Sequence, residues 1–298
     1  LKTTGYLSPE KPLVLPFERI DNLYVEGPPV HYSFPELQSA KSLNVRQAKS
    51  LSVPKLQTAG DLQVGFKEPA ATSLPALTTA RNISLYGTIR EVQIPLLEEV
   101  EGLKIGQRGS SVQLVRLDVP LLSSAKRLEV RSLNLDDEQL SALFPSLVEV
   151  KGDVLVGLGK REGVALELKQ LQKAGRIWVE AKPGWTLLLP EATEVGSLSP
   201  LSGASVVEAP KLVSLDHLTS DSSQLKRLAF PKLERLEDLF LSKATDDLVI
   251  HMPNVGGLNR FSLSDSPLRQ LQIASGIETI NQNYSVERNP NLERLPLT

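Results

Sequence analysis

The sequence predicts a mainly β protein built as a parallel β-solenoid, and three observations support this class. A short segment recurs along most of the chain, at intervals of 19 to 25 residues. Each copy holds two pieces of alternating apolar residues, and a proline follows the second piece. Two strands and a turn are too small to bury an apolar face alone, so successive copies must stack. We therefore expect about 12 coils, each one copy of the segment.

The recurring segment reads "SVPKLQTAGDLQV" at 52–64, "SLPALTTARNISL" at 73–85 and "QIPLLEEVEGLKI" at 93–105. Its Leu-x-Val end alternates with period two, which is typical of a strand with one buried face. The proline cannot donate a ladder hydrogen bond, so it ends the preceding strand and turns the chain. In "KQLQKAGRIWV", 169–179, Lys169 stands at the position of the proline.

Two segments depart from the pattern. In "LDDEQLSALFPSL", 135–147, Asp136 is a suitable helix N-cap and the leucines follow at helical spacing, which predicts a short inserted helix near 136–144. The stretch "GLGKREGVALEL", 157–168, matches the repeat least and predicts either a loose coil or a boundary between two half-arrays. We expect one solenoid domain, 1–298, with an N-terminal cap at 1–30, repeats at 31–273 and a C-terminal cap at 274–298.

Composition excludes several classes of function. The 33 basic and 35 acidic residues nearly cancel and form no long block of one sign, so we expect no nucleic-acid partner. The chain has no cysteine, which removes disulfides and thiol chemistry. No apolar run reaches the roughly 18 residues of a membrane-spanning helix, so we expect no direct membrane insertion within this segment. Any signal or anchor is expected to lie outside this sequence, which begins at Leu1.

Four phrases carry a resemblance to a known family: "AGDLQV" (59–64), "VEGLKI" (100–105), "VKGDVLV" (150–156) and "RNPNLERLPL" (288–297). They resemble receptor L-domains, the leucine-rich-repeat-like β-helices of insulin- and EGF-type receptors, fungal cell-wall proteins and bacterial surface proteins. The resemblance implies a right-handed coil with a binding or structural role and no catalysis. The chain departs from the family in lacking capping disulfides and in having only two glycosylation sequons, at Asn82 and Asn283. These departures favour a bacterial surface or secreted protein.

Residues with catalytic or metal-binding chemistry are few and scattered. His31, His217 and His251 lie far apart, with no second ligand type at a metal-binding interval, so we interpret them as solvent or turn histidines and expect no metal site. The acidic doublets at 136–137 and 246–247 are explained by helix capping and a turn. No acid recurs at one coil position, which indicates no catalytic residues. The glycines of "GLKIGQRG", 102–109, are interpreted as turn glycines, and no cofactor is expected.

The candidate binding site is the exposed strand face. The middle residue of each Leu-x-Val strand points away from the core, and these residues should form one outward stripe. They are Tyr24, Asn44, Gln63, Ser84, Lys104, Glu129, Leu155, Trp178, Ser199, Phe240 and Ser262. Two positions further along, the same face should present Arg46, Tyr86, Arg131 and Glu180. We take as candidate binding residues Trp178, Glu180, Lys104, Glu129, Arg131, Tyr86, Arg46 and Phe240; the alternative for Trp178 is packing under 157–168.

These observations favour a non-catalytic binding or surface-scaffold module that recognises a protein or glycan partner through its strand face. Two alternatives stay open: a carbohydrate-active β-helix enzyme, either a lyase or a hydrolase, and an intracellular leucine-rich-repeat adaptor or effector. We expect an extracellular or cell-surface location, with a cytoplasmic one still possible, and a monomer.

Overall fold

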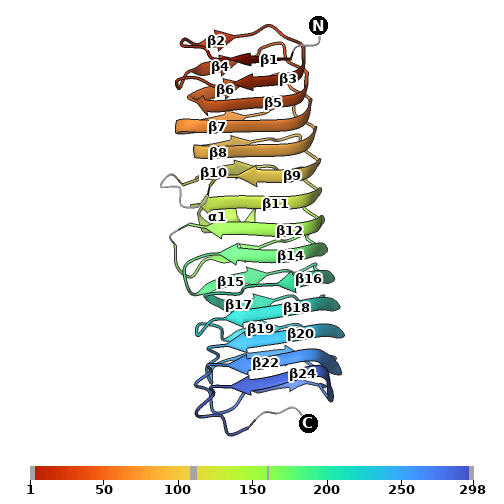
Figure 1. The fold of residues 1–298 in the computed structure, drawn as a ribbon. Coiled ribbons are helices and arrows are strands. Elements are labelled where there is room, and N and C mark those ends of the chain that lie inside the picture. Colours follow the sequence, from red (N-terminus) through yellow and green to blue (C-terminus); the bar gives the residue numbers. More distant parts are fainter. Residues whose placement is uncertain (1–3, 108–112, 160, 295–298) are drawn as a thin grey trace. The chain divides into compact units, whose positions relative to one another are not determined.

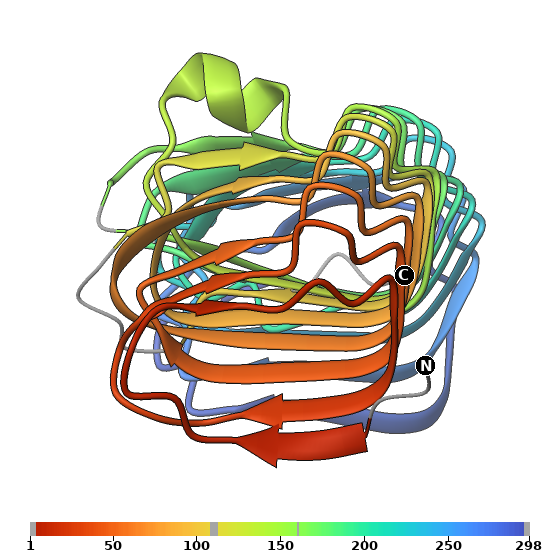
Figure 2. The same cartoon turned by 90° about the horizontal axis from the view of Figure 1, so that it is seen from above.

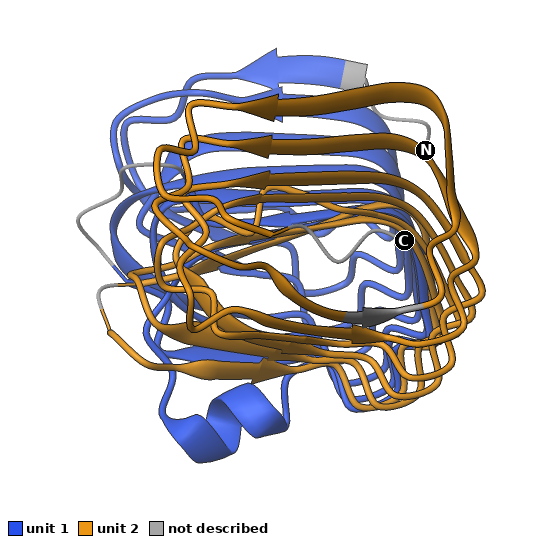
Figure 3. Ribbon diagram, turned by 90° about the horizontal axis from the view of Figure 1, so that it is seen from below, with its two compact units in different colours: residues 1–147 blue, residues 148–298 orange. Residues whose placement is uncertain are grey.

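The computed structural model of the chain describes residues 4–107, 113–159 and 161–294. It is mainly β, with 56% strand and 2% helix, and its parallel sheets form a β-solenoid of about 13 turns where the repeat predicts about 12. The chain separates into two compact units, Leu1–Leu147 and Val148–Thr298, which are coloured separately in Figure 3. Each unit is described by itself.

The first unit has a main parallel sheet in which strands that are one coil apart in sequence lie side by side (Figure 1). In order, the described strands of this sheet are β1 (Thr4–Leu7), β3 (Arg19–Val25), β5 (Ser39–Ala48), β7 (Thr58–Ser73), β8 (Thr79–Gln93), β9 (Glu99–Ile105) and β11 (Ser124–Leu133). The opposite wall consists of β2 (Leu13–Val14), β4 (His31–Ser33) and β6 (Ser50–Ser52), together with β10 (Arg116–Asp118), which pairs with the end of β8.

The second unit repeats this arrangement with two parallel sheets. Its main sheet contains β12 (Glu149–Leu158), β14 (Lys173–Glu180), β16 (Glu194–Leu198), β18 (Ser214–Asp221), β20 (Arg235–Ser242), β22 (Gly257–Ser264) and β24 (Thr279–Glu287). Its second sheet contains β13 (Ala165–Glu167), β15 (Trp185–Leu188), β17 (Ala204–Glu208), β19 (Arg227–Ala229), β21 (Val249–Met252) and β23 (Gln272–Ser275).

The core of each coil comes from the Leu-x-Val strand, as the alternation predicts. In the first unit one buried row crosses the main sheet in strict register, with side chains 0–3% exposed: Leu23, Leu43, Leu62, Ile83, Leu103 and Leu128. Burying one such side chain stabilises the fold by roughly 1.5–3 kcal/mol. Because each row member packs on the next coil, the stack forms one continuous interior within the unit.

The recurring proline is explained by a tight turn. In one coil the N–H of Leu56 donates to the carbonyl of Val53 at 3.2 Å, which makes Pro54 the second residue of a four-residue turn. Proline favours that position because its ring already fixes the required φ. Lys169 occupies the same place in its own coil, where the N–H of Leu171 donates to the carbonyl of Leu168 at 3.3 Å. The turn geometry therefore persists where the proline is missing.

The predicted inserted helix exists but is shorter than expected. It is α1, Asp137–Ser141, and Asp136 is its N-cap in a full capping box with Gln139. Phe144, which we expected inside the helix near 136–144, instead has a positive φ of 53° in the turn that follows. In Figure 2 the helix lies outside the coils of the first unit.

Ion pairs join equivalent positions in successive coils. In the first unit Lys41 Nζ lies 3.2 Å from Asp21 Oδ1. In the second unit Lys173 Nζ lies 2.9 Å from Glu194 Oε1, in the row Glu149, Lys173, Glu194. Each exposed pair contributes only about 0–1 kcal/mol to stability. Opposite charges nevertheless stand on neighbouring coils at these positions.

Candidate functional site

The outward face of the first unit carries the predicted stripe in register. Hydrogen-bonded neighbours across the main sheet give the row Tyr6, Tyr24, Asn44, Gln63, Ser84, Lys104 and Glu129. Most of these side chains are half-buried, because each packs against the equivalent residue of the next coil, whereas Tyr6 and Lys104 are exposed. The face is therefore a closely packed row of polar and aromatic groups.

A second set of residues lies two positions after the members of the first row: Glu26, Arg46, Gly65, Tyr86, Gly106 and Arg131. Gly65 and Tyr86 are direct neighbours across β7 and β8. A Cβ on Gly65 would come within 2.6 Å of the ring carbon Cε2 of Tyr86, so the ring extends across the neighbouring coil and covers that glycine. Gly65 gives the aromatic side chain room to lie along the sheet.

Beside Tyr86 lies a cluster of three charged side chains. Glu129 Oε1 is 2.7 Å from Arg131 Nε and 3.2 Å from Lys104 Nζ. The side chains of Glu129 and Arg131 are only 17% and 13% exposed. Burial acts to raise the pKa of Glu129, but hydrogen bonds from Arg131 and Lys104 outweigh it and hold that pKa below its ordinary value. The carboxylate is therefore ionised and fully engaged by its two cations.

Two adjoining hollows lie along these rows, and together they are called the strand-face groove. One has a volume of about 560 Å³ and is lined by Gln63, Ser84, Tyr86, Lys104, Glu129 and Arg131, among others. The other, of about 440 Å³, is lined by residues that include Glu26, Arg46, Gly65 and Lys67. Tyr86 and Gln107 line both hollows. Tyr86 therefore lies between the two hollows and contributes to both.

The groove ends at a stack of side chains near β1. The rings of Tyr6 and Tyr24 stack with centroids 5.3 Å apart, and the guanidinium of Arg46 lies 5.1 Å from the Tyr24 centroid. Tyr24 donates its hydroxyl hydrogen to Glu26 Oε2 at 2.7 Å, and this hydrogen bond raises the pKa of Tyr24. Aromatic and cationic groups therefore continue from the groove toward the first strand.

Five of the eight predicted site residues line the strand-face groove: Arg46, Tyr86, Lys104, Glu129 and Arg131. The other three, Trp178, Glu180 and Phe240, belong to the second unit. Sequence reasoning missed several other lining residues, among them Gly65, Lys67 and Gln107. Gly65 could have been found by aligning the coils, since it stands where its neighbours carry Arg46 and Tyr86.

In the second unit the outward face is less regular. Trp178 is half-buried beside Leu155, and the guanidinium of Arg176 lies 5.9 Å from its ring centroid. Leu155, expected on the exposed stripe, is only 8% exposed. Ser199 lies outside β16, which ends at Leu198. The residue paired with Phe240 in the preceding coil is Thr219, which the predicted stripe omitted. The predicted stripe is therefore interrupted in this unit.

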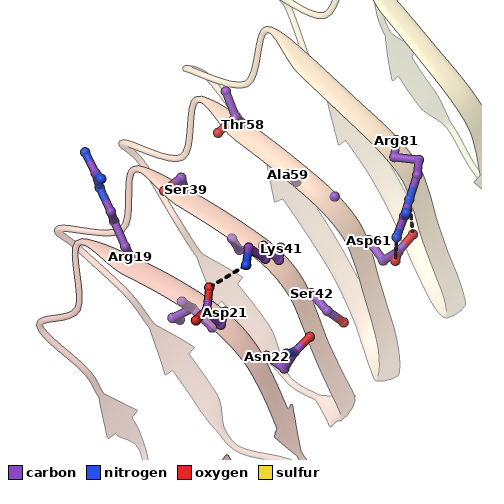
Figure 4. A pocket seen from close by; sticks show the side chains of 13 residues that line it. Arg19, Asp21, Asn22, Ser39, Lys41, Ser42, Thr58, Ala59, Asp61 and Arg81 are labelled. Carbon is purple, nitrogen blue, oxygen red and sulfur yellow. Dashed lines mark hydrogen bonds and ion pairs between the residues drawn. The ribbon is translucent and has the colours of Figure 1, made fainter. Parts of the chain in front are cut away.

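A different kind of groove lies at the coil corners (Figure 4). The larger corner groove, about 880 Å³, is in the first unit and is lined by Arg19, Asp21, Lys41, Asp61 and Arg81, among others. Asp21 pairs with Lys41 and Asp61 with Arg81, whereas the side chain of Arg19 extends away from both pairs. The second unit has a corner groove of about 750 Å³ that is also lined by both signs of charge. No aromatic side chain lines either groove within the described residues.

Five described carboxyl groups have pKa values that depart clearly from the ordinary value. Every carboxyl whose pKa departs clearly from its ordinary value has a lowered one, because a cation donates to it: Asp61, Glu129, Asp221, Asp238 and Asp265. A general acid that works near neutral pH needs a raised pKa instead.

One polar cluster in the second unit was not foreseen. His217 and Arg260 both contact Asp238, whose side chain is 2% exposed. The three residues occupy one coil position in three successive coils. We interpreted His217 as a solvent or turn histidine, and the structure shows it half-exposed and paired with a buried acid.

Comparisons with known proteins return no matching family model, curated protein or solved structure. Among the described residues, no helix has the length and apolar character needed to cross a bilayer. Nor do three or more His, Cys, Asp or Glu side chains of the described ranges gather as they would around a metal ion.

Proposed function

We propose that the chain is a non-catalytic binding module and that the strand-face groove of its first unit receives the ligand. One observation carries the proposal: five side chains selected from the sequence line the two adjoining hollows, with Tyr86 between them. A rigid sheet positions these side chains without loops, so little conformational entropy is lost on binding. The L-domain-like phrases of the sequence support the same class of role and a right-handed coil.

The strand-face groove is preferred over the larger corner grooves for two reasons. It contains an aromatic side chain that lies along the surface, and aromatic groups supply much of the binding energy in recognition sites. The Asp61–Arg81 and Asp21–Lys41 pairs of the first unit's corner groove already neutralise one another. A ligand that binds these side chains must first break the ion pairs, and this loss offsets the contacts that the ligand gains.

The enzyme alternative has less support. The acids of the strand-face groove, Glu26 and Glu129, accept hydrogen bonds from Tyr24 and from Arg131, and the pKa of Glu129 is lowered. A hydrolase or lyase built on paired carboxylates needs one of them protonated or free to act as a base. Binding without turnover fits these residues better.

The proposal is tested by probing a panel of immobilised glycans and peptides with the whole chain and with Tyr86→Ala. Tyr284→Ala is the matched control, because Tyr284 is 51% exposed and stacks on Phe261 in the second unit. We expect one ligand class to bind, with at least tenfold weaker binding by Tyr86→Ala and unchanged binding by Tyr284→Ala. Retention by Tyr86→Ala would overturn the proposal. Loss only in a Trp178→Ala variant would move the site to the second unit.

A further inference from the structure

We infer that the ligand of the strand-face groove is an acidic polysaccharide, a linear chain whose sugars carry carboxylates; this inference rests on the proposed function. The described lining residues of the two hollows include four basic side chains, Arg46, Lys67, Lys104 and Arg131, against two acidic ones, Glu26 and Glu129. The groove therefore has an excess of positive charge in a chain whose overall charge is −2.

Arg46 pairs with Glu26 at 3.8 Å, so the positive excess lies at Lys67 and in the cluster of Glu129 with its two cations. Glu129 is shared by Lys104 and Arg131, so that cluster keeps one net positive charge. Lys67 is exposed and has no ion-pair partner within the described ranges. The first unit's corner groove has three basic residues against two acidic ones, and the second unit's has three against three. An anionic ligand is therefore favoured most at the strand face.

The backbone argues against an extended peptide that adds a strand. β7, β8 and β9 are central strands, each hydrogen-bonded to a neighbour on both sides. No free strand edge exists at the floor of the groove, so strand addition cannot supply affinity there. The ligand must be recognised by side chains alone, as a chain of sugar rings is.

The groove offers the groups that sugar rings use. Tyr86 has one part of its ring over Gly65 and is half-buried, which leaves ring surface for the C–H face of a sugar. Gln63 accepts a hydrogen bond from Asn44 Nδ2 at 2.8 Å, and its own amide nitrogen can donate to a hydroxyl. Gln107 lines both hollows and adds a second amide.

The spacing of the coils also suits such a polymer. Strands of the main sheet follow one another at roughly 4.8 Å, which is close to the length of one sugar unit in an extended chain. A polysaccharide that crosses the strands from Arg131 on β11 toward Arg46 on β5 would place about one sugar over each coil. Each carboxylate then meets the outward side chains of one or two coils.

The test is calorimetric titration of the whole chain with oligogalacturonate and with the same oligomer after its carboxyl groups are reduced to alcohols. We expect the acidic oligomer to bind at least tenfold more tightly than the reduced one at about 0.02 M salt, with most of the difference lost at about 0.5 M salt. Lys67→Gln should weaken the acidic oligomer about threefold to tenfold and leave the reduced one unchanged. Lys232→Gln, an exposed lysine of the second unit, is the charge-matched control and should change neither.

The outcomes separate the two proposals. Equal binding of both oligomers, lost in Tyr86→Ala, would overturn the acidic ligand and keep the binding site. Binding only of peptides in the panel, again lost in Tyr86→Ala, would do the same. Absence of any Tyr86-dependent ligand would overturn both proposals. Unchanged thermal midpoints of the variants show that each loss comes from the groove.

Discussion

Nδ1 of His217 lies 2.7 Å from Oδ2 of Asp238, a carboxylate whose side chain is only 2% exposed. On the other side Arg260 donates to both oxygens of the same carboxylate, with Nε at 2.9 Å from Oδ1. Removing one partner of a buried pair costs far more than the pair contributes, because the remaining charge stays desolvated. The cluster therefore joins three successive coils through one buried acid.

Arg260→Ala should lower the free energy of unfolding by about 2–3 kcal/mol, less than for a fully buried pair because His217 remains as a donor. Asp238→Asn should cost only about 1 kcal/mol, since it removes the buried charge and leaves its half-exposed partners to water. Urea denaturation of the two variants and the wild type measures both values. Equal losses, or a larger loss for Asp238→Asn, would contradict the buried-charge explanation.

Stability should fall in acid. Hydrogen bonds from Arg81, Lys243, Arg260 and Arg288 lower the pKa values of Asp61, Asp221, Asp238 and Asp265 respectively. A carboxyl whose folded pKa lies below its unfolded value of about 3.9 stabilises the fold above that pH, and this contribution is lost as the pH falls through the folded pKa. We expect the unfolding free energy to decline below about pH 4. The unfolding free energy of Asp238→Asn should decline less steeply with falling pH than that of the wild type. An identical decline would show that Asp238 does not contribute to the acid sensitivity.

Replacement by alanine should affect stability much less at Gly65 than at Gly87, although both glycines belong to the first unit. In Gly65→Ala the new Cβ meets the far end of the Tyr86 ring, which can move aside, so stability should change by less than about 1 kcal/mol while ligand binding weakens. Gly87 has a φ of +85°, and a Cβ there would lie 2.1 Å from the carbonyl oxygen of Phe66. Gly87→Ala should therefore cost about 1–3 kcal/mol or more. Thermal midpoints and binding constants of the pair distinguish a displaced ring from a strained backbone.

Lys169→Pro should stabilise the chain by about 0.4–1 kcal/mol, because proline restricts the unfolded chain and the native turn already accepts it in the other coils. Gln170→Pro is the control at the next turn position and should destabilise, since proline is disfavoured there and restricts Lys169 as well. The two unfolding midpoints in urea provide the measurement. A destabilising Lys169→Pro would mean that this turn differs from those with a proline.

The sequence predicts the coils well because their cause is local. Alternation like that at Leu62 and Val64 and a turn like that at Pro54 repeat in most coils, and Asp136 with Gln139 marks the helix start. Contacts between coils are harder to predict, because the interval varies from 19 to 25 residues and the alignment must be known first.

The missed features follow from that difficulty. His217 was judged by its own neighbours in sequence, whereas its partner Asp238 stands 21 residues later at the same coil position. Leu155 follows the outward pattern and is nevertheless 8% exposed, so period-two alternation alone does not predict how far neighbouring coils cover a side chain. Of the candidate site, Arg46, Tyr86, Lys104, Glu129 and Arg131 were predictable from their strand positions, whereas Glu26 and Lys67 were missed. Gly65, which gives Tyr86 its space, can be found only once the coils are aligned.

Opposite charges on neighbouring coils affect which strands pair when a chain of similar coils folds. A chain of similar coils could pair a strand with the second coil along instead of the next. Such a slip past β14 would bring Glu149 beside Glu194, where Lys173 now stands between them in the row. In the first unit, a slip past β7 would bring Lys41 near Arg81. Like charges would then face each other, which disfavours the mispaired arrangement. Ion pairs that add little stability can therefore still favour correct pairing of the coils during folding.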